Sequence, residues 1–377
     1  MTLTLPVWID DPTNAAILAV GEDRLAGFQL DPFGEIAARS GLDIATVLDR
    51  IVAMLRAGTI RRVRQTLMAT NLADGALCAW QVPAERLDDA FAWLFREDPF
   101  SGHVVIRTTD SATAGSNYRL WTTLKVPQGF ALEKHAQFLA ATIGAQAHRL
   151  MPAKALFALG VGHVRRRGLE PGARAAEPAD VKDTKIVELD ALEWRVLTAI
   201  KREFAIGEIV RDVWAGRARE AGVSLEEFER VGKALGAKGV IGRFSTFLEH
   251  VKPQQQAGGR SVTRYNALFH WKVPPGRELD AGREVGRHYI MTHAYWREGG
   301  PEFKGVNIMG VAHGMEKEAV LAHKAVIDEH LRAAGIAFDY TNVFWGGRSE
   351  IKPSEIAPAA YLEFCARHGL DPEAMRS

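Results

Sequence analysis

The sequence lacks the features that mark several common classes of protein. Its 377 residues include only two cysteines, Cys78 and Cys365, whose separation excludes a disulfide framework or a cysteine-based metal site. It has no apolar run of about 18 residues, the length that a transmembrane helix needs. The N-terminal stretch also lacks the basic flank and apolar core of a secretion signal. We therefore expect a cytoplasmic protein that does not contact a membrane.

An excess of charge of one sign is also missing, because 47 basic residues offset 46 acidic residues and leave a formal net charge of +1. A global field that attracts nucleic acid or an anionic membrane is therefore not expected, and an anionic ligand must meet local basic residues. The sequence contains no phosphate-binding loop and no dinucleotide fingerprint. It also shows no Ser-His-Asp or Cys-His spacing that would indicate a hydrolase.

The sequence does contain an internal repeat. The segment GTIRRV at 58–63 returns as GVIGRF at 239–244, GALCAWQVP at 75–83 as NALFHWKVP at 266–274, and HVVIR at 103–107 as HAYWR at 293–297. Three landmarks that recur in the same order indicate a tandem duplication.

Each half predicts the same series of elements. Residues 32–62 predict a short helix, a turn at Gly41, an amphipathic helix that ends near Gly58 and then a strand, the spacing of a winged helix-turn-helix. The strand, helix, strand, strand, helix, strand order that follows is that of a ferredoxin-like domain. The expected fold class is α+β, a tandem duplication of a winged helix-turn-helix followed by a ferredoxin-like βαββαβ domain. The expected segments are winged helices at 1–72 and 188–262, ferredoxin-like domains at 73–164 and 263–352, a linker at 165–187, a hairpin insertion at 251–264 and a tail at 353–377.

Polar side chains recur at matched positions of one strand in each half. Because residues alternate along a strand, His293, Tyr295 and Arg297 share one face of the second-half strand. His103 and Arg107 occupy the same places in the first half, with a valine between them. A solvated strand face would give the same pattern, but its recurrence favours a site. Histidine moves protons near neutral pH and can bind iron, and arginine holds carboxylates, so these strands suit an anionic substrate that needs a proton nearby.

These motifs, in this order and twice over, resemble the siroheme decarboxylases, which are relatives of Lrp/AsnC-type regulators. The resemblance rests on HAYWR with GVNIMGVAHG, HVVIR with NYRLWTTL, and the AWQVP and HWKVP strands, and it spans residues 10 to 350. The family removes carbon dioxide from two acetate side chains of siroheme, on the route to haem or haem d1. It works as heterodimers or as fused two-part chains, and this sequence looks like the fused form.

The resemblance implies a site, a substrate and a set of roles. Its implied catalytic or substrate-binding residues are His293, Arg297, Tyr295, His103 and Arg107. The iron tetrapyrrole is the substrate, so no external cofactor is expected, and the protein alone supplies no metal site. Cationic partners are expected for the remaining carboxylates, and the candidates are Arg61, Arg62, Arg119, Arg243 and Lys304. His313, which ends the strand next to the motif, is a further candidate for substrate binding. A homodimer and other proteins of tetrapyrrole biosynthesis are candidate partners.

An Lrp/AsnC-type DNA-binding regulator is one alternative function. The expected reading helices begin with acidic residues, among them Asp43 in the first half and Glu226 and Glu227 in the second. Such residues repel a phosphate backbone, so we expect helix-turn-helix scaffolds without functional DNA binding. A non-catalytic tetrapyrrole sensor or carrier is the other alternative, in which His103 or His293 is an axial ligand to the substrate iron.

Overall fold

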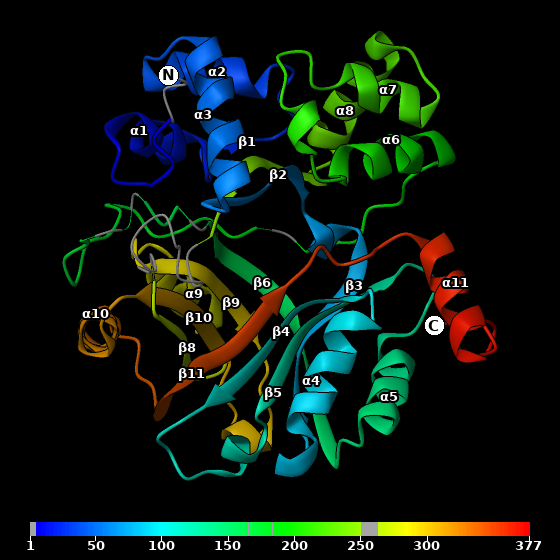
Figure 1. Cartoon of the computed structure of the whole chain (residues 1–377). Coiled ribbons are helices and arrows are strands. Elements are labelled where there is room, and N and C mark those ends of the chain that lie inside the picture. The colour runs from blue at the N-terminus through cyan, green and yellow to red at the C-terminus, as the bar shows by residue number, and fades with distance from the viewer. Residues whose placement is uncertain (1–4, 161, 165, 167, 183, 250–262) are drawn as a thin grey trace. The chain divides into compact units, whose positions relative to one another are not determined.

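The computed structural model describes residues 5–160, 162–164, 166, 168–182, 184–249 and 263–377 (Figure 1). Two compact units make up the chain, and each of them draws on both halves of the sequence. Unit 1 consists of Met1–Met68, Gly160–Gly168 and Val187–Thr263, and unit 2 of Ala69–Leu159, Leu169–Ile186 and Arg264–Ser377. Among the described helices, none has the length and apolarity to cross a membrane.

Unit 1 is mainly helical. Its elements are α1 (Pro12–Gly21), β1 (Leu25–Ala26), α2 (Pro32–Ser40), α3 (Ile44–Ala57), β2 (Ile60–Leu67), α6 (Ala191–Lys201), α7 (Ala215–Ala221), α8 (Leu225–Ala237) and β7 (Ile241–Leu248). Local sequence explains the first helices, because Asp43 caps α3 by accepting from the Thr46 N–H, and Gly41 and Gly58 end α2 and α3 in the left-handed region. Strand β7 lies between β1 and β2, so the strands expected as two separate wings pair with each other.

Unit 2 contains the same series of elements twice. The first series is β3 (Ala73–Gln81), α4 (Leu87–Arg96), β4 (Ser101–Thr108), β5 (Leu120–Pro127), α5 (Leu132–Ile143) and β6 (Ala147–Leu159). The second is β8 (Tyr265–Lys272), α9 (Glu278–Gly286), β9 (Met291–Arg297), β10 (Ile308–Gly314), α10 (Lys317–Ala333) and β11 (Tyr340–Ile351), and α11 (Pro358–His368) follows it.

The eight long strands of unit 2 close into one barrel in the order β10-β8-β11-β4-β5-β3-β6-β9 (Figure 1). Two antiparallel ladders join the halves, one between β6 and β9 and the other between β11 and β4. The sequence led us to expect two separate ferredoxin-like sheets, and this part of the prediction is corrected. Each sheet has two edge strands that need hydrogen-bond partners, and the edges of the other sheet supply them.

Three apolar clusters fill unit 2. One lies between the first-half sheet and α4, α5 and α11, and another between the second-half sheet and α9 and α10. The third fills the barrel interior with residues of both halves, among them Val105, Trp121, Met151, Met309 and Phe344. The mixed α+β class expected from the sequence is thus confirmed. The expected hairpin insertion falls largely on residues 250–262, outside the described residues.

Candidate functional site

The polar residues of β4 point into the barrel. Val105 belongs to the interior cluster, so the alternation of side chains places His103 and Arg107 on the same side. His103 Nε2 lies 2.8 Å from Ser349 Oγ on β11. Burial lowers the pKa of Arg107 to about 10, so its guanidinium stays cationic at neutral pH in an interior where only 4% of the residue is exposed.

The motif of β9 faces the interior as well. Tyr295 lies opposite Met309, a member of the interior cluster, and His293 and Arg297 share its side of the strand. The rings of His293 and Tyr295 stack with centroids 6.1 Å apart, and the Arg297 guanidinium carbon lies 4.4 Å from the Tyr295 centroid. Burial raises the pKa of Tyr295, although the charge of Arg297 opposes the shift. The strand therefore gathers an imidazole, a phenol and a guanidinium on its inner face.

A chain of hydrogen bonds connects the two motif strands. Arg107 Nη1 donates to Asn266 Oδ1 at 3.2 Å, and Asn266 Nδ2 lies 3.2 Å from His313 Nε2. Thr292 Oγ1 continues the chain, at 3.4 Å from His313 Nδ1 and 3.1 Å from His293 Nδ1. The sequence-predicted residues His293, His313 and Arg107 thus belong to one network.

Thr292 connects the two histidines of the network. The Thr292 hydroxyl donates to the Val311 carbonyl at 3.0 Å, so its oxygen accepts N–H bonds from His293 Nδ1 and His313 Nδ1. Asn266 Nδ2 faces His313 Nε2, so each ring nitrogen of His313 has a polar neighbour. The arrangement holds the His293 and His313 rings on one hydroxyl group.

The repeat places Lys125 where the second half has His313. Asn266 pairs with His313 across β8 and β10, and Gly75, its counterpart in the repeat, pairs with Lys125 across β3 and β5. All neighbouring strands of the barrel run antiparallel, so these two pairs lie at the same end of the barrel. The sequence analysis missed Lys125 and Asn266, although an alignment of the two repeats would have matched these positions.

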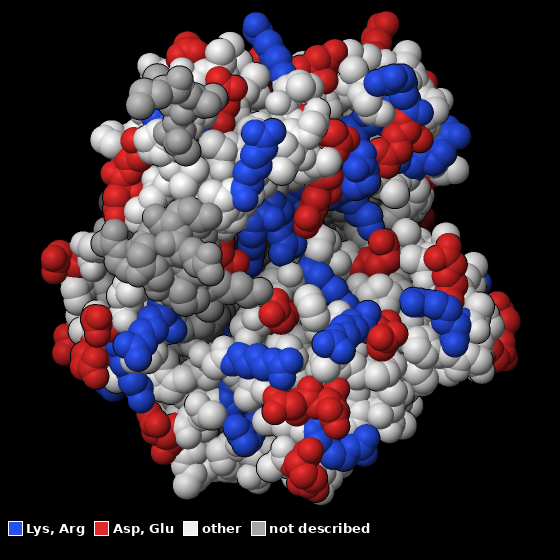
Figure 2. Space-filling view, in the orientation of Figure 1, with Lys and Arg blue, Asp and Glu red and all other residues white. Residues whose placement is uncertain are grey.

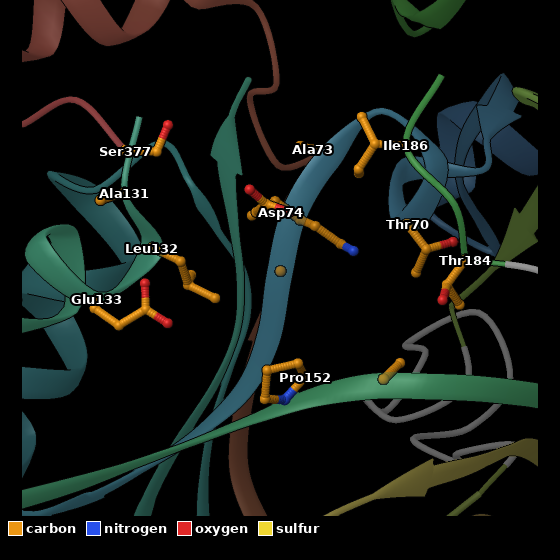
Figure 3. A pocket seen from close by; sticks show the side chains of 13 residues that line it. Thr70, Ala73, Asp74, Ala131, Leu132, Glu133, Pro152, Thr184, Ile186 and Ser377 are labelled. Atoms are coloured by element: carbon orange, nitrogen blue, oxygen red, sulfur yellow. The ribbon is translucent and has the colours of Figure 1, made fainter. Parts of the chain in front are cut away.

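A cavity of about 490 Å³ opens beside Lys125 (Figure 3). Asp74 of β3, Leu132 at the start of α5 and Pro152 of β6 surround it in the figure. Its lining is Thr70, Ala73, Asp74, Gly75, Lys125, Ala131, Leu132, Glu133, Pro152, Ala153, Thr184, Ile186 and Ser377. The barrel end therefore combines a buried polar network, mostly on the second-half strands, with an open cavity on the first-half strands whose charged lining residues are Lys125, Asp74 and Glu133.

Two of the other expected carboxylate partners belong to unit 2. Arg119 is half-buried just before β5, where its carbonyl accepts from the Arg107 N–H at 2.7 Å. Lys304 is exposed in the connection between β9 and β10, and its Nζ lies 4.8 Å from the centroid of the Tyr340 ring. Elsewhere on the visible face of unit 2, cationic and anionic side chains are interspersed (Figure 2).

The remaining three expected partners belong to unit 1. Arg62 pairs with Glu203 at 3.0 Å. The guanidinium carbons of Arg61 and Arg243 lie 5.9 and 5.8 Å from the centroid of the Phe247 ring. Arg64, which the sequence analysis did not select, joins them at 5.3 Å. The structure thus brings these arginines together on the β2–β7 sheet, in a separate unit from the barrel residues.

Comparison with known proteins defines the class of the first barrel half. Residues 72–158 match the family model of the AsnC-like ligand-binding domain. The siroheme decarboxylase beta subunit of Desulfovibrio desulfuricans is 30% identical over 84 residues, which are 22% of this chain and 48% of that protein. The chain thus spans about half the length of the curated relative that it matches.

Solved structures share the fold of almost the whole chain. The siroheme decarboxylase NirDL is similar with a TM-score of 0.63 and 18% identity, over 95% of this chain and 100% of that one. NirDL in co-complex with an iron-uroporphyrin III analogue gives a TM-score of 0.63 and 18% identity, over 94% and 99% of the two chains. The resemblance to the siroheme decarboxylase family is confirmed by these matches together.

Proposed function

We propose that this protein decarboxylates the acetate side chains of siroheme, without oxidation, to give didecarboxysiroheme. The observation that carries the proposal is the pair of interior motif strands, which place His103 with Arg107 and His293 with Arg297 inside one barrel. The name of the curated relative and the shared fold of NirDL support the same activity. They do not favour a DNA-binding regulator.

The roles follow from the chemistry of the groups. Arg297 or Arg107 holds one acetate by charge-assisted hydrogen bonds. The bond between the methylene and carboxyl carbons breaks, carbon dioxide leaves, and the electron pair passes into the methylene–macrocycle system. His293 or Tyr295 then delivers a proton to the methylene carbon, which becomes a methyl group. The balance needs one proton and no oxidant or reductant, so this chain's residues and the substrate suffice.

The repeated elements support a further part of the proposal. We infer that the chain arose by tandem duplication of a winged helix-turn-helix followed by a ferredoxin-like domain, because β3–β6 and β8–β11 repeat one element order. Under this proposal the two motif strands derive from one ancestral strand, and the helices of unit 1 serve as scaffold. Arg119 and Lys304, which belong to the same unit as the motif strands, are proposed to meet other carboxylates of the macrocycle.

Anaerobic incubation of the purified protein with siroheme, followed by mass spectrometry, tests the activity. We expect a stepwise mass loss that corresponds to two carbon dioxide molecules. His293→Ala and His103→Ala then show which strand serves each step, and Arg348→Ala, at an exposed position of β11, is the matched control. Tight binding of siroheme at unchanged mass would refute the decarboxylase and leave the sensor or carrier.

A further inference from the structure

Lys125 occupies an unusual position for a lysine. It is half-buried at the end of β5 and lines the cavity, and within the described part of the chain no hydrogen bond or ion pair holds its Nζ. A buried ammonium ion normally has a partner, because desolvation of an unpaired charge costs free energy. The Lys125 ammonium is therefore a candidate partner for an anionic group that enters the cavity.

Small residues give the Lys125 side chain its position beside the cavity. Gly75 lies opposite Lys125, and a Cβ on Gly75 would come within 2.5 Å of the Lys125 Cδ. Ala153, which also lines the cavity, lies opposite Arg297 on the neighbouring strand. The Lys125 side chain therefore lies over Gly75 at the edge of the cavity, and Arg297 lies behind the cavity wall, opposite Ala153.

The charged groups around Lys125 come from three elements. Arg297 of β9 is near enough that its positive charge disfavours protonation of Lys125, whereas Asp74 of β3 favours it. Glu133 of α5 lines the cavity. Burial first, and Arg297 second, lower the pKa of Lys125 to about 7. The side chain can therefore change its charge near neutral pH.

The equivalent place in the second half is already filled. There His313 contacts Asn266, which also accepts from Arg107, and the position opposite Arg107 is Gly346. Asn266 thus gives Arg107 a side-chain acceptor. Gly75, the counterpart of Asn266, has no side chain that could do the same for Arg297. The two halves of the barrel differ in this respect, one with an internal acceptor and one with a cavity.

We propose that Lys125 and Arg297 form a carboxylate-binding subsite, in which Lys125 takes up a proton as the carboxylate binds. The ligand class is a polycarboxylate with one side chain short enough to enter the barrel end. An acetate side chain of a tetrapyrrole has this chemistry. Only the identity of the natural ligand rests on the proposed function. The subsite assigns substrate capture to the first-half cavity and identifies Lys125 as a substrate-binding residue.

Binding of metal-free uroporphyrin III, a tetrapyrrole polycarboxylate, to the full chain tests the subsite. Calorimetric titrations at pH 8 in two buffers of different ionisation enthalpy measure the protons taken up. Because free Lys125 is mostly neutral at this pH, we expect an uptake of nearly one proton per ligand in the wild type. Lys125→Met should abolish the uptake and weaken binding by on the order of tenfold. Lys125→Arg, which keeps a fixed charge, should bind without uptake.

Lys272→Met is the matched control, because Lys272, at the end of β8, pairs with Asp339 at 3.2 Å and its side chain is 42% exposed. It should bind and take up protons as the wild type does. Undiminished affinity or undiminished proton uptake in Lys125→Met would overturn the subsite. The siroheme assay distinguishes failure of the subsite from failure of the proposed function. If proton uptake depends on Lys125 but siroheme is not decarboxylated, only the enzyme activity is refuted.

Discussion

Arg107 and Arg297 reach across the two ladders that join the halves of the barrel. Arg107 Nη1 donates to the Phe344 carbonyl on β11 at 3.4 Å, and Arg297 Nη1 donates to the Met151 carbonyl on β6. Each arginine thus lies at the end of its motif strand and bonds to the last strand of the other half. The same side chains hold the barrel together and present positive charge inside it.

Replacement of the arginine beside the cavity should reduce activity. In Arg297→Lys, the planar fork that can hold a carboxylate with two N–H donors is lost, although the charge remains. We expect kcat/KM for siroheme decarboxylation to fall about 10- to 100-fold, as for loss of roughly 1.5–3 kcal/mol from a charged hydrogen bond. Steady-state kinetics will measure this, with the exposed Arg348→Lys as control. Wild-type kinetics in Arg297→Lys would contradict the assigned role.

Removal of the amide that connects Arg107 to His313 should destabilise the barrel. Asn266→Ala leaves both partners without the hydrogen bonds at 3.2 Å that they now have with Asn266. We expect the free energy of unfolding to fall by about 1–3 kcal/mol, the usual cost of unsatisfied buried groups. Urea denaturation will test this against Asn117→Ala, an exposed position. Equal losses in the two variants would show that the network contributes nothing.

The Lys125→Met substitution should raise stability below neutral pH while it weakens ligand binding. The pKa of Lys125 is near 7 in the folded state and near 10.5 when unfolded, so between these values the unfolded state binds the extra proton. Stability of the wild type therefore rises with pH through this window, and below pH 7 the folded state carries the full cost of the buried charge.

Urea unfolding at pH 6.5 and pH 9.5 will measure this difference. We expect the wild type to gain stability at the higher pH, and Lys125→Met to gain less. If both proteins respond to pH alike, another group dominates.

A side chain at Gly75 should close the subsite. In Gly75→Ala, the added Cβ meets Lys125 Cδ at 2.5 Å and the Leu124 carbonyl oxygen at 2.8 Å, so the lysine must move and the ladder must shift. We expect weaker uroporphyrin III binding and a lower midpoint of unfolding. Gly216→Ala, where a Cβ meets nothing within 4 Å, is the control and should behave as the wild type. Unchanged binding in Gly75→Ala would show that the cavity is not used.

Local pattern was sufficient to predict much of the fold and one part of the site. Helical periodicity with Gly41 and Gly58 gave α2 and α3, and alternation placed His293 and Arg297 on one strand face, which the structure shows to be the inner face. Their catalytic roles stay a prediction.

Long-range pairing could not be predicted in the same way. The ladders between β6 and β9 and between β11 and β4 join strands far apart in sequence, and the hydrophobic pattern of an edge strand does not specify its partner. Lys125 escaped notice because its neighbours Trp121 and Leu124 indicate an ordinary buried strand. Charge alone selected Arg61 and Arg243, which the structure places in unit 1.

The two ladders between the halves also bear on stoichiometry. Each half supplies two edge strands that are satisfied only by the other half, so the halves behave as complementary subunits held in one polypeptide. Covalent connection fixes their ratio at one to one and raises their effective concentration for each other. A cleavage within residues 169–186 should therefore leave two fragments that stay associated, with the site still assembled from both.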